Sequence, residues 1–554
     1  MSGDLDWWRG AVIYQIYPRS FFDSNGDGDG DLPGVTSKMD YIASLGVDAI
    51  WLSPFFTSPM KDMGYDISDY RNVDPRFGTL TDVDVMIAAA HQRGIKVIID
   101  QVLNHTSDQH PWFEESRRSR HNPKSDWYVW ADPKMDGTVP NNWLSVFGGS
   151  SWQWDSRRRQ YYLHNFLSSQ PDLNFHNPEV VEQLLSDMTF WLERGVDGFR
   201  LDAIDFCYYD LHLRDNPSKL ADEVVMVEEL GVALGAGREN PYTYQHHLYD
   251  KTCPENLLFL AKVRKLMDKY PGVTTIGELG GDGALETMGQ YTSGNDKLHM
   301  AYTFELVTPR NDVAYLRSTI EKTEIEIKDG WPCWTIGNHD CMRVATRWSS
   351  PAVDDQLRQE RLRVYAVLLL TLRGSVCIYQ GEELGLEEAD LAYEDLVDPF
   401  GLAFWPEFKG RDGCRTPMPW RAEEELTAGF SPGGKSWLPL WQAHRADAVN
   451  VQEDNPESLL NAYRTFLRWR RGQKILLKGA ITVHDACKNV LLFERSYEGK
   501  RLLVALNFSN QAETLAIPGT IESSVSELFL MRAEWGDHQV CLPPYGIGMA
   551  WLKR

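Results

Sequence analysis

The sequence predicts an α/β protein built around a (β/α)8, or TIM, barrel, with a small inserted domain after the third strand and an all-β domain at the C-terminus. Short apolar runs alternate with segments of helical period up to about residue 385, and period-two runs follow nearer the C-terminus. Eight strand candidates fit one closed barrel, and they begin near Ala11, Ala49, Lys96, Gly198, Thr274, Leu298, Trp334 and Ser375.

The segments between the strand candidates have the apolar spacing of helices that pack on a sheet. Val180–Arg194 and Leu257–Tyr270 are amphipathic, whereas Gln356–Leu372 is more apolar. A last helix is expected over Glu457–Arg471. This alternation of strands and helices is typical of βα units that feed a parallel sheet.

Two insertions interrupt the barrel pattern. The stretch 105–176 is too long for one βα loop and is rich in Trp, Asn, Asp, Gly and Pro, so we expect a small domain there. A second insertion, at about 386–430, follows the eighth strand candidate. The predicted domains are therefore a barrel formed by 1–104 and 177–476, an inserted domain over 105–176, and a C-terminal β-sandwich over 477–554.

Composition limits the partners of this chain. Its 554 residues carry a net charge of −23, which makes nucleic acid and anionic membranes poor partners for the whole protein. The 20 Trp residues suit the stacking of sugar rings, although most of them are expected in the core, and the acidity taken alone indicates little beyond solubility. We expect a small neutral substrate and a monomer or homodimer.

The cysteines and the N-terminus point to the cytoplasm. Eight Cys are scattered without a Cys-x-x-Cys pair, so they are expected to be reduced thiols, and Cys207 to be a packed one. The first residues, Met1 to Asp6, lack the basic and apolar regions of a signal peptide, and no apolar run of about 18 residues occurs. We therefore expect no membrane span.

Three acids end apolar strand candidates: Asp202, Glu278 and Asp340. Arg200 lies two residues before Asp202, on the same face of a strand. Carboxyl ends of barrel strands are where barrel enzymes hold their catalytic groups, and a carboxylate pair suits glycoside chemistry. We expect Arg200 to keep Asp202 ionised, and an apolar strand to raise the pKa of Glu278.

These segments resemble glycoside hydrolase family 13, the α-amylase superfamily, over nearly the whole chain. The resemblance is carried by Asp100–His105, Gly198–Ile204, Gly277-Glu278 and Asn338–Asp340. Two further segments resemble its oligo-1,6-glucosidase and α-glucosidase branch: Gln170–Asn174 and Arg415–Trp420, although Gly413-Cys414 stands where that branch usually has Asn-Ala.

The resemblance implies a role for each acid. Asp202 would be the nucleophile, Glu278 the general acid and base, and Asp340 the stabiliser that holds sugar hydroxyls. His105 and His339 would bind hydroxyls of the attacked glucose. Retention of the anomeric configuration is likewise implied by the family.

The resemblance also implies an exo-acting pocket. Asp66 would bind the non-reducing glucose, with Arg411 as its ion-pair partner and Tyr65 as a stacking platform. Such a pair closes the pocket behind one glucose, which argues against an open endo-acting cleft. Three weaker candidates for the pocket wall, each of which could equally be plain packing, are Phe147, Phe166 and Gln170.

An acidic loop after the first strand candidate is a candidate metal site. Oxygen side chains alternate with glycines from Asp23 to Asp31, as in the first half of an EF-hand, but Gly34 stands where its twelfth-position Glu belongs. The family branch carries a calcium-type loop here, which implies a structural Ca²⁺ or Mg²⁺ held by Asp23, Asn25, Asp27, Asp31 and the carbonyl of Asp29. The alternative is a metal-free acidic turn. No organic cofactor is expected.

Ala203 bears on the linkage that is cleaved. In this branch, valine at this position accompanies α-1,6 preference and a smaller residue accompanies α-1,4, so Ala203 implies short maltose-like substrates, with sucrose possible. The expected activity is an α-glucosidase that also transfers glucose to sugar or alcohol acceptors. The alternatives are an oligo-1,6-glucosidase, a glucosyl-transferring or isomerising relative, and a non-catalytic transporter subunit, which would need a membrane anchor.

Overall fold

A computed structural model describes residues 5–220, 240–349 and 355–553 of the chain. Its centre is a parallel barrel in which the strands follow the order β11-β10-β9-β5-β2-β1-β13-β12. The two outermost strands meet through a parallel bridge between Ala301 and Pro332, which closes the barrel. These strands are β1 (Val12–Ile16), β2 (Ala49–Leu52), β5 (Lys96–Val102), β9 (Gly198–Asp202), β10 (Thr274–Leu279), β11 (Met300–Thr303), β12 (Cys333–Thr335) and β13 (Ser375–Tyr379). All eight strand predictions and the predicted fold class are confirmed.

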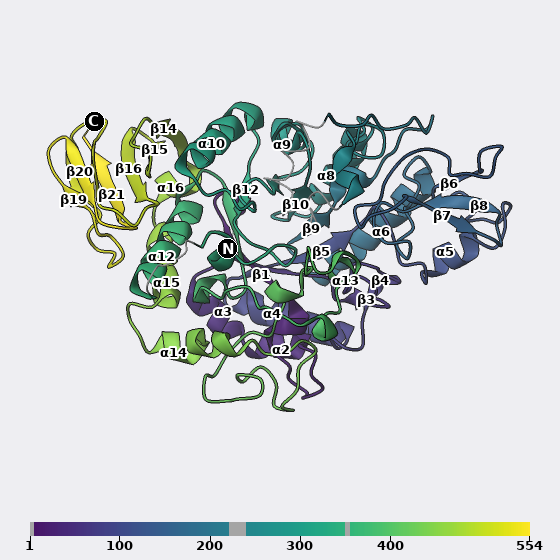
Figure 1. Cartoon of the computed structure of the whole chain (residues 1–554), viewed down its shortest axis with the longest axis horizontal. Helices are drawn as coiled ribbons and strands as arrows, with labels where there is room; N and C mark the ends of the chain where they lie inside the picture. The colour runs from purple at the N-terminus through teal and green to yellow at the C-terminus, as the bar shows by residue number, and fades with distance from the viewer. Residues whose placement is uncertain (1–4, 221–239, 350–354, 554) are drawn as a thin grey trace.

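Helices surround the barrel (Figure 1). The predicted helices correspond to α6, α8, α12 and α15, with ends that differ by at most three residues. The described α-helices are α1 (Pro18–Phe21), α2 (Leu32–Ser37), α3 (Met39–Leu45), α4 (Leu80–Gln92), α5 (Pro111–Ser116), α6 (Pro178–Arg194), α8 (Asn256–Met267), α9 (Ala284–Thr292), α10 (Val313–Ile327), α11 (Val344–Arg347), α12 (Asp355–Thr371), α13 (Pro399–Phe404), α14 (Val449–Glu453), α15 (Leu459–Arg471) and α16 (Lys474–Lys478). None of the described helices is long and apolar enough to span a bilayer.

Local sequence explains where α6 begins and ends. Asn177 caps its first turn by accepting from the backbone N–H of Glu179, and Pro178 supplies a first residue that needs no hydrogen bond. The helix ends at Gly195, whose φ of 100° lies in the left-handed region that glycine adopts without strain. This short stop lets the chain turn directly into β9 at Gly198.

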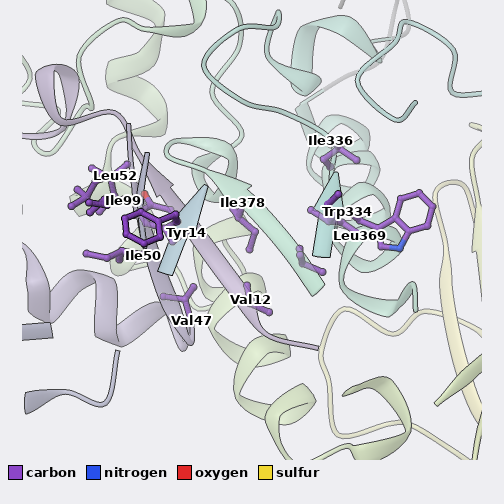
Figure 2. Close-up of a cluster of buried hydrophobic side chains, with 14 of the residues drawn as sticks. Val12, Tyr14, Val47, Ile50, Leu52, Ile99, Trp334, Ile336, Leu369 and Ile378 are labelled. Atoms are coloured by element: carbon purple, nitrogen blue, oxygen red, sulfur yellow. The ribbon is translucent and has the colours of Figure 1, made fainter. Parts of the chain in front are cut away.

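Alternation along the strands separates two apolar layers. Side chains such as Val12, Tyr14 and Ile50 pack outward against the helices, in the cluster that Figure 2 shows. The intervening side chains fill the barrel interior together with large aromatic rings. That inner cluster contains Trp8, Ile13, Ala49, Trp51, Ile98, Ile276, Met300, Tyr302, Trp331, Cys333 and Cys377.

The region after β5 contains a small antiparallel sheet, which lies far from the C-terminal strands in Figure 1. It has the order β6-β8-β7 and comprises β6 (Trp130–Ala131), β7 (Trp152–Asp155) and β8 (Gln160–Leu163). A hairpin of β3 (Phe56–Thr57) and β4 (Asp69–Val73) follows β2. Both additions extend from the carboxyl ends of barrel strands, where they can shape a pocket.

The C-terminal part is all β, as predicted. Its five-stranded sheet comprises β14 (Ala480–His484), β15 (Val490–Tyr497), β16 (Lys500–Asn507), β21 (Ile547–Leu552) and β18 (Ile521–Ser524), and its three-stranded sheet comprises β17 (Glu513–Ala516), β20 (Gln539–Leu542) and β19 (Glu534–Trp535). Arg495 on β15 is fully buried and donates to the carbonyls of Thr371 and Leu372 at 2.6 and 2.9 Å, which joins this domain to the end of α12. The exact domain boundaries stay predictions.

Candidate active site

The alternation that fills the barrel also places charged groups at its carboxyl end. Ile98 and Ile276 point into the barrel, so Asp100 and Glu278, each two residues further on, point the same way. Strand pairing sets Arg200 level with Asp100. An apolar barrel interior is therefore capped by a layer of ionisable side chains.

Arg200 is the centre of this layer and has no exposed surface. Its Nη1 lies 2.8 Å from Asp100 Oδ1 and 2.6 Å from Asp202 Oδ1, and its Nη2 lies 2.6 Å from Glu278 Oε1. Tyr302 donates to the same Glu278 oxygen at 2.8 Å, and the Ala203 N–H donates to Glu278 Oε2 at 3.0 Å. One guanidinium thus holds the two predicted reacting carboxylates side by side.

Three carboxylates around a single guanidinium favour retention of a proton. Burial raises the pKa of Asp202 well above its ordinary value, against the lowering effect of Arg200, while Glu278 raises it further. Burial also raises the pKa of Asp100 to about 6. Arg200 lowers the pKa of Asp202, as expected, but burial raises this pKa by more than the guanidinium lowers it. The carboxyl groups of this cluster titrate together, so one of them can be protonated while another is ionised.

Asp340 follows β12 and lies between two other cations. Arg415 Nη2 lies 2.8 Å from Asp340 Oδ1, and Arg411 Nη1 lies 3.2 Å from the same oxygen. Although burial opposes it, the Arg411 and Arg415 guanidinium groups hold the pKa of Asp340 below its usual range. This carboxylate is suited to stay ionised and accept hydrogen bonds from a ligand. Arg415 belongs to a motif noted in the sequence, but its role there was not predicted.

The structure corrects one predicted contact. Asp66 is fully buried beneath the pocket, where it accepts from the Ser58 hydroxyl and from the backbone N–H groups of Lys61 and Asp62. The ion-pair partner of Arg411 is instead Asp62, with Nη2 and Oδ1 2.8 Å apart. Asp62 lines the pocket, whereas Asp66 holds the turn that presents Asp62.

Arg411 is fixed from its other side by Asp398, an acid that the sequence analysis missed. Arg411 Nη2 lies 2.7 Å from Asp398 Oδ1, and Nε donates to Asp398 Oδ2 at 3.1 Å. Asp398 caps α13 by accepting from the Phe400 N–H. The spacing of Asp62 from Tyr65 could have suggested Asp62, but no local signal links Asp398 to Arg411.

Tyr65 and His339 form a stacked pair with ring centroids 5.3 Å apart and an interplanar angle of 9°. Gln15 donates to His339 Nδ1 at 2.7 Å, which leaves Nε2 to donate to the Tyr65 hydroxyl, and that hydroxyl donates to Asp100 Oδ2 at 3.0 Å. Burial lowers the pKa of His339 well below its ordinary value, so its ring is neutral. The chain of donors ends at a carboxylate that also binds Arg200.

The other predicted pocket residues are found near this pair. His105 Nε2 lies 3.0 Å from the Tyr65 carbonyl oxygen, and burial lowers the pKa of His105 to about 4. Gln170 donates to Asp62 Oδ2 at 2.9 Å, so it supports the pocket wall from behind. Phe166 packs against the His105 ring with centroids 5.2 Å apart, and Phe147 lies 6.2 Å from Phe166.

Most of these side chains line one pocket, although His339 and Gln170 lie behind its lining. Its floor is polar, with Asp62, Asp202, Glu278, Asp340 and Arg411, and its upper wall is mainly aromatic. The wall comes from three separate segments, since Phe166 follows β8, Phe206 follows β9 and Phe400 lies in the first turn of α13. The remaining lining residues are Tyr65, His105, Val146, Phe147, Ala203, Asp205, Tyr242, Lys251, Gly280, Phe304 and Phe408.

The side chains of the acidic loop after β1 contact the loop's own backbone and Arg19. Asp23 accepts from the backbone N–H groups of Asn25, Gly26 and Gly28, and Asp29 is paired with Arg19 at 2.5 Å. Within the described ranges, no three His, Cys, Asp or Glu side chains gather as metal ligands would. The donor set Asp23, Asn25, Asp27, Asp29 and Asp31 therefore stays a prediction.

Residues 15–479 match the family described as alpha amylase, catalytic domain. This chain belongs to the α-amylase family, glycoside hydrolase family 13. It is 53% identical over its whole length to a probable alpha-glucosidase of Rhizobium meliloti (strain 1021), 98% of which is covered. It is 37% identical to an oligo-1,6-glucosidase of Heyndrickxia coagulans, over 93% of this chain and 94% of that protein.

Solved structures of α-amylase family members extend this similarity to three dimensions. The crystal structure of the alpha-glucosyl transfer enzyme XgtA superimposes with a TM-score of 0.93 at 52% identity and covers 99% of each chain. A trehalulose synthase, MutB from Pseudomonas mesoacidophila MX-45, gives a TM-score of 0.86 at 32% identity over 99% of each chain. Enzymes that hydrolyse, transfer or isomerise glucosides therefore share this α-amylase family fold.

Proposed function

We propose that this protein is an exo-acting, retaining α-glucosidase that releases α-glucose from the non-reducing end of short α-1,4-linked glucosides and also transfers glucose to other acceptors. The observation that carries the proposal is the attachment of Asp202 and Glu278 to two nitrogens of the same Arg200 guanidinium, at 2.6 Å each. Binding of both carboxylates to one guanidinium favours the short distance between the carboxyl groups of a retaining pair, about 5–5.5 Å. An inverting pair has a wider separation that admits a water molecule.

In the first step Asp202 attacks the anomeric carbon while Glu278 gives its proton to the glycosidic oxygen. The bond to the leaving sugar breaks, the leaving sugar departs as a neutral alcohol, and a glucosyl ester forms on Asp202. The geometry around Arg200 supports this division, because one guanidinium holds both carboxyl groups at the same end of the barrel. Asp340, kept ionised by Arg411 and Arg415, would accept hydroxyl hydrogen bonds as the sugar ring distorts.

In the second step Glu278 acts as a base. It takes a proton from water or from an acceptor hydroxyl, whose oxygen attacks the anomeric carbon and releases Asp202. Hydrolysis and transfer therefore differ only in the nucleophile of this step. The relationship to the transfer enzyme XgtA supports a substantial transfer activity.

Exo action is supported by the closed end of the pocket. Asp62 and Arg411 are paired at 2.8 Å and Arg411 also reaches Asp340, so this group crosses the pocket floor beside the acid that would hold the first glucose. Phe147 covers the Arg411 guanidinium at 5.4 Å from the ring centroid. A polysaccharide that needed to pass through both ends would meet this barrier.

Preference for α-1,4 linkages is supported by Ala203. This residue lines the pocket next to Asp202, and its backbone has φ 39° and ψ 46°. A β-branched side chain is disfavoured in that left-handed conformation and would add bulk on the wall. The competing function is an oligo-1,6-glucosidase, which the Heyndrickxia coagulans relative represents.

The decisive experiment follows the products from maltose, isomaltose and sucrose with the wild type and with Asp202→Ala, while resolving the anomer of the glucose first released. We expect α-glucose from maltose, oligosaccharides from transfer, and neither product with the variant. Faster cleavage of isomaltose than of maltose would overturn the linkage preference. Initial β-glucose would overturn retention.

A further inference from the structure

Lys251 is a buried cation of the pocket wall, and the proposed mechanism does not use it. It is 8% exposed and lies between 3₁₀ helix η1 (Ile204–Phe206) and α8. Its ammonium is 2.9 Å from Asp205 Oδ2, donates to the Gly280 carbonyl at 2.6 Å, and lies 4.6 Å from the centroid of the Phe206 ring. These four residues all line the pocket.

The two partners of Lys251 follow the two reacting acids in the chain. Asp205 comes three residues after Asp202, and Gly280 comes two residues after Glu278. The ammonium therefore joins the segments that leave β9 and β10 just beyond their catalytic ends. The Asp205 carboxylate is 2% exposed, and its Oδ1 makes no hydrogen bond within the part of the chain that the structure describes. Lys251 is thus its main source of charge compensation.

The contacts of Lys251 with Asp205 and Gly280 lie on the side of the pocket that receives the leaving sugar. The donor glucose is bounded by the group formed by Asp62, Arg411 and Asp340, which shares no residue with the Lys251 group. The oxygen that Glu278 protonates belongs to the leaving sugar, so the wall beyond Glu278 faces that sugar and, in the second step, the acceptor. An ammonium has three N–H donors, and its two contacts here leave one for a ligand hydroxyl.

We infer that Lys251 is a positioning residue of the acceptor site, which orients an incoming sugar hydroxyl and thereby sets the partition of the glucosyl-enzyme between sugar acceptors and water. The aromatic wall beside it supplies stacking surface but few hydrogen-bond donors, so loss of this N–H removes one of the few polar contacts that the wall provides. The inference rests on the proposed α-glucosidase activity and concerns its second step.

The test uses p-nitrophenyl α-glucoside as donor and either isotopically labelled glucose or methanol as acceptor, with transfer product measured per p-nitrophenol released. Methanol is too small to use a sugar subsite, so it reports the intrinsic reactivity of the intermediate. For Lys251→Met we expect the sugar-to-methanol ratio of transfer to fall at least fivefold, and for Lys251→Arg to fall less. A structural role alone would lower the total rate while leaving this ratio within twofold, and that result would overturn the inference.

A second variant keeps the test decisive where Lys251→Met does not fold. Asp205→Asn keeps the side-chain shape but removes the charge that holds the ammonium, so the same ratio should fall. An unchanged ratio in a folded Asp205→Asn protein would count against the inference. Failure of the wild type to release any p-nitrophenol would instead reject the proposed function, and the two failures are therefore distinguishable.

Discussion

Arg411 is bonded to Asp62 across 349 residues of sequence, with Nη2 and Oδ1 2.8 Å apart. Asp62 lies on the turn between β3 and β4, and Arg411 lies in the insertion after β13, so two separate excursions from the barrel meet over its floor. Burial of the pair in a low-dielectric pocket strengthens its attraction but makes loss of either partner expensive. The pair therefore closes the pocket, and we expect the donor site to be sensitive to loss of either partner.

Asp62→Asn should lower kcat/KM on maltose by about tenfold to 200-fold, the effect of losing a charge-assisted hydrogen bond of about 1.5–3 kcal/mol. Asp66→Asn is the matched control. It removes a carboxylate that faces three donors of its own turn and not the pocket, so it should lower the melting temperature more than kcat/KM. Steady-state kinetics gives kcat/KM and calorimetry gives the melting temperature of both variants. A larger loss of kcat/KM for Asp66→Asn than for Asp62→Asn would contradict this assignment.

Asp202 and Glu278 should differ in their dependence on the leaving group. Glu278→Gln cannot donate a proton, so its rate of maltose cleavage should fall by about 10²–10⁴-fold. The rate of p-nitrophenolate release should fall less, because this group leaves without protonation. Asp202→Ala should lose activity on both substrates, because no covalent intermediate can form. Pre-steady-state rates on the two donors measure this contrast. Equal losses on both donors for Glu278→Gln would contradict its role as the acid.

Ala203→Val should impair catalysis through the backbone. A β-branched residue at φ 39° carries strain of about 1–3 kcal/mol, and relief of that strain would move the N–H that donates to Glu278 at 3.0 Å. Ala203→Gly adopts the same conformation without strain and serves as the control. We expect lower kcat with Val and near wild-type kcat with Gly. Similar kcat values for the two variants would exclude the backbone explanation.

Substitution by glutamine should change the stability in opposite directions at two adjacent acids, Glu382 and Glu383. Burial raises the pKa of Glu382 to about 8, so between pH 4.5 and about 8 the unfolded chain releases this proton while the folded chain keeps it. Stability is therefore lost as pH rises through that window, and Glu382→Gln should recover about 2 kcal/mol or more at pH 8 and much less at pH 5. Urea titrations at the two pH values measure the difference.

Glu383→Gln is the comparison for that experiment. Glu383 accepts hydrogen bonds from the Tyr14 and Tyr41 hydroxyls at 2.6 and 2.7 Å and from the Gly381 N–H at 2.8 Å. An amide nitrogen in place of one oxygen would face a donor, so this variant should lose about 1–3 kcal/mol. Stabilisation of both variants at pH 8 would show that burial of the Glu382 carboxylate does not control the effect.

The loop from Asp23 to Asp31 remains a predicted Ca²⁺ or Mg²⁺ site, and metal removal can test it. If the loop binds a cation, EDTA should lower the melting temperature and added Ca²⁺ should restore it. At a Ca²⁺ concentration one hundred times Kd, binding should raise the free energy of unfolding by about 2.7 kcal/mol. Asp27→Asn should abolish the response without breaking the backbone hydrogen bonds that Asp23 accepts. An unchanged melting temperature in EDTA would favour a metal-free acidic turn.

Local pattern was sufficient for the fold. Side chains alternate between the two sides of a strand, so apolar runs such as Lys96–Val102 and Thr274–Leu279 could be recognised, and their number and spacing indicated a closed barrel. The same alternation placed Arg200 beside Asp202 correctly. The motif that contains Asp66 was also recognised, but the wrong aspartate was chosen, because both acids flank the same turn and only its folding decides which one faces inward.

The sequence by itself determined the barrel, the C-terminal β domain and the three strand-end acids, because these depend on the period of neighbouring residues. The tertiary structure alone decided that Asp62 pairs with Arg411, that Asp398 fixes Arg411 from behind, and that burial outweighs Arg200 at Asp202. Ion pairs and desolvation depend on groups that the folded chain brings together from distant segments. No local pattern specifies such contacts, since each partner is compatible with many others until the barrel closes.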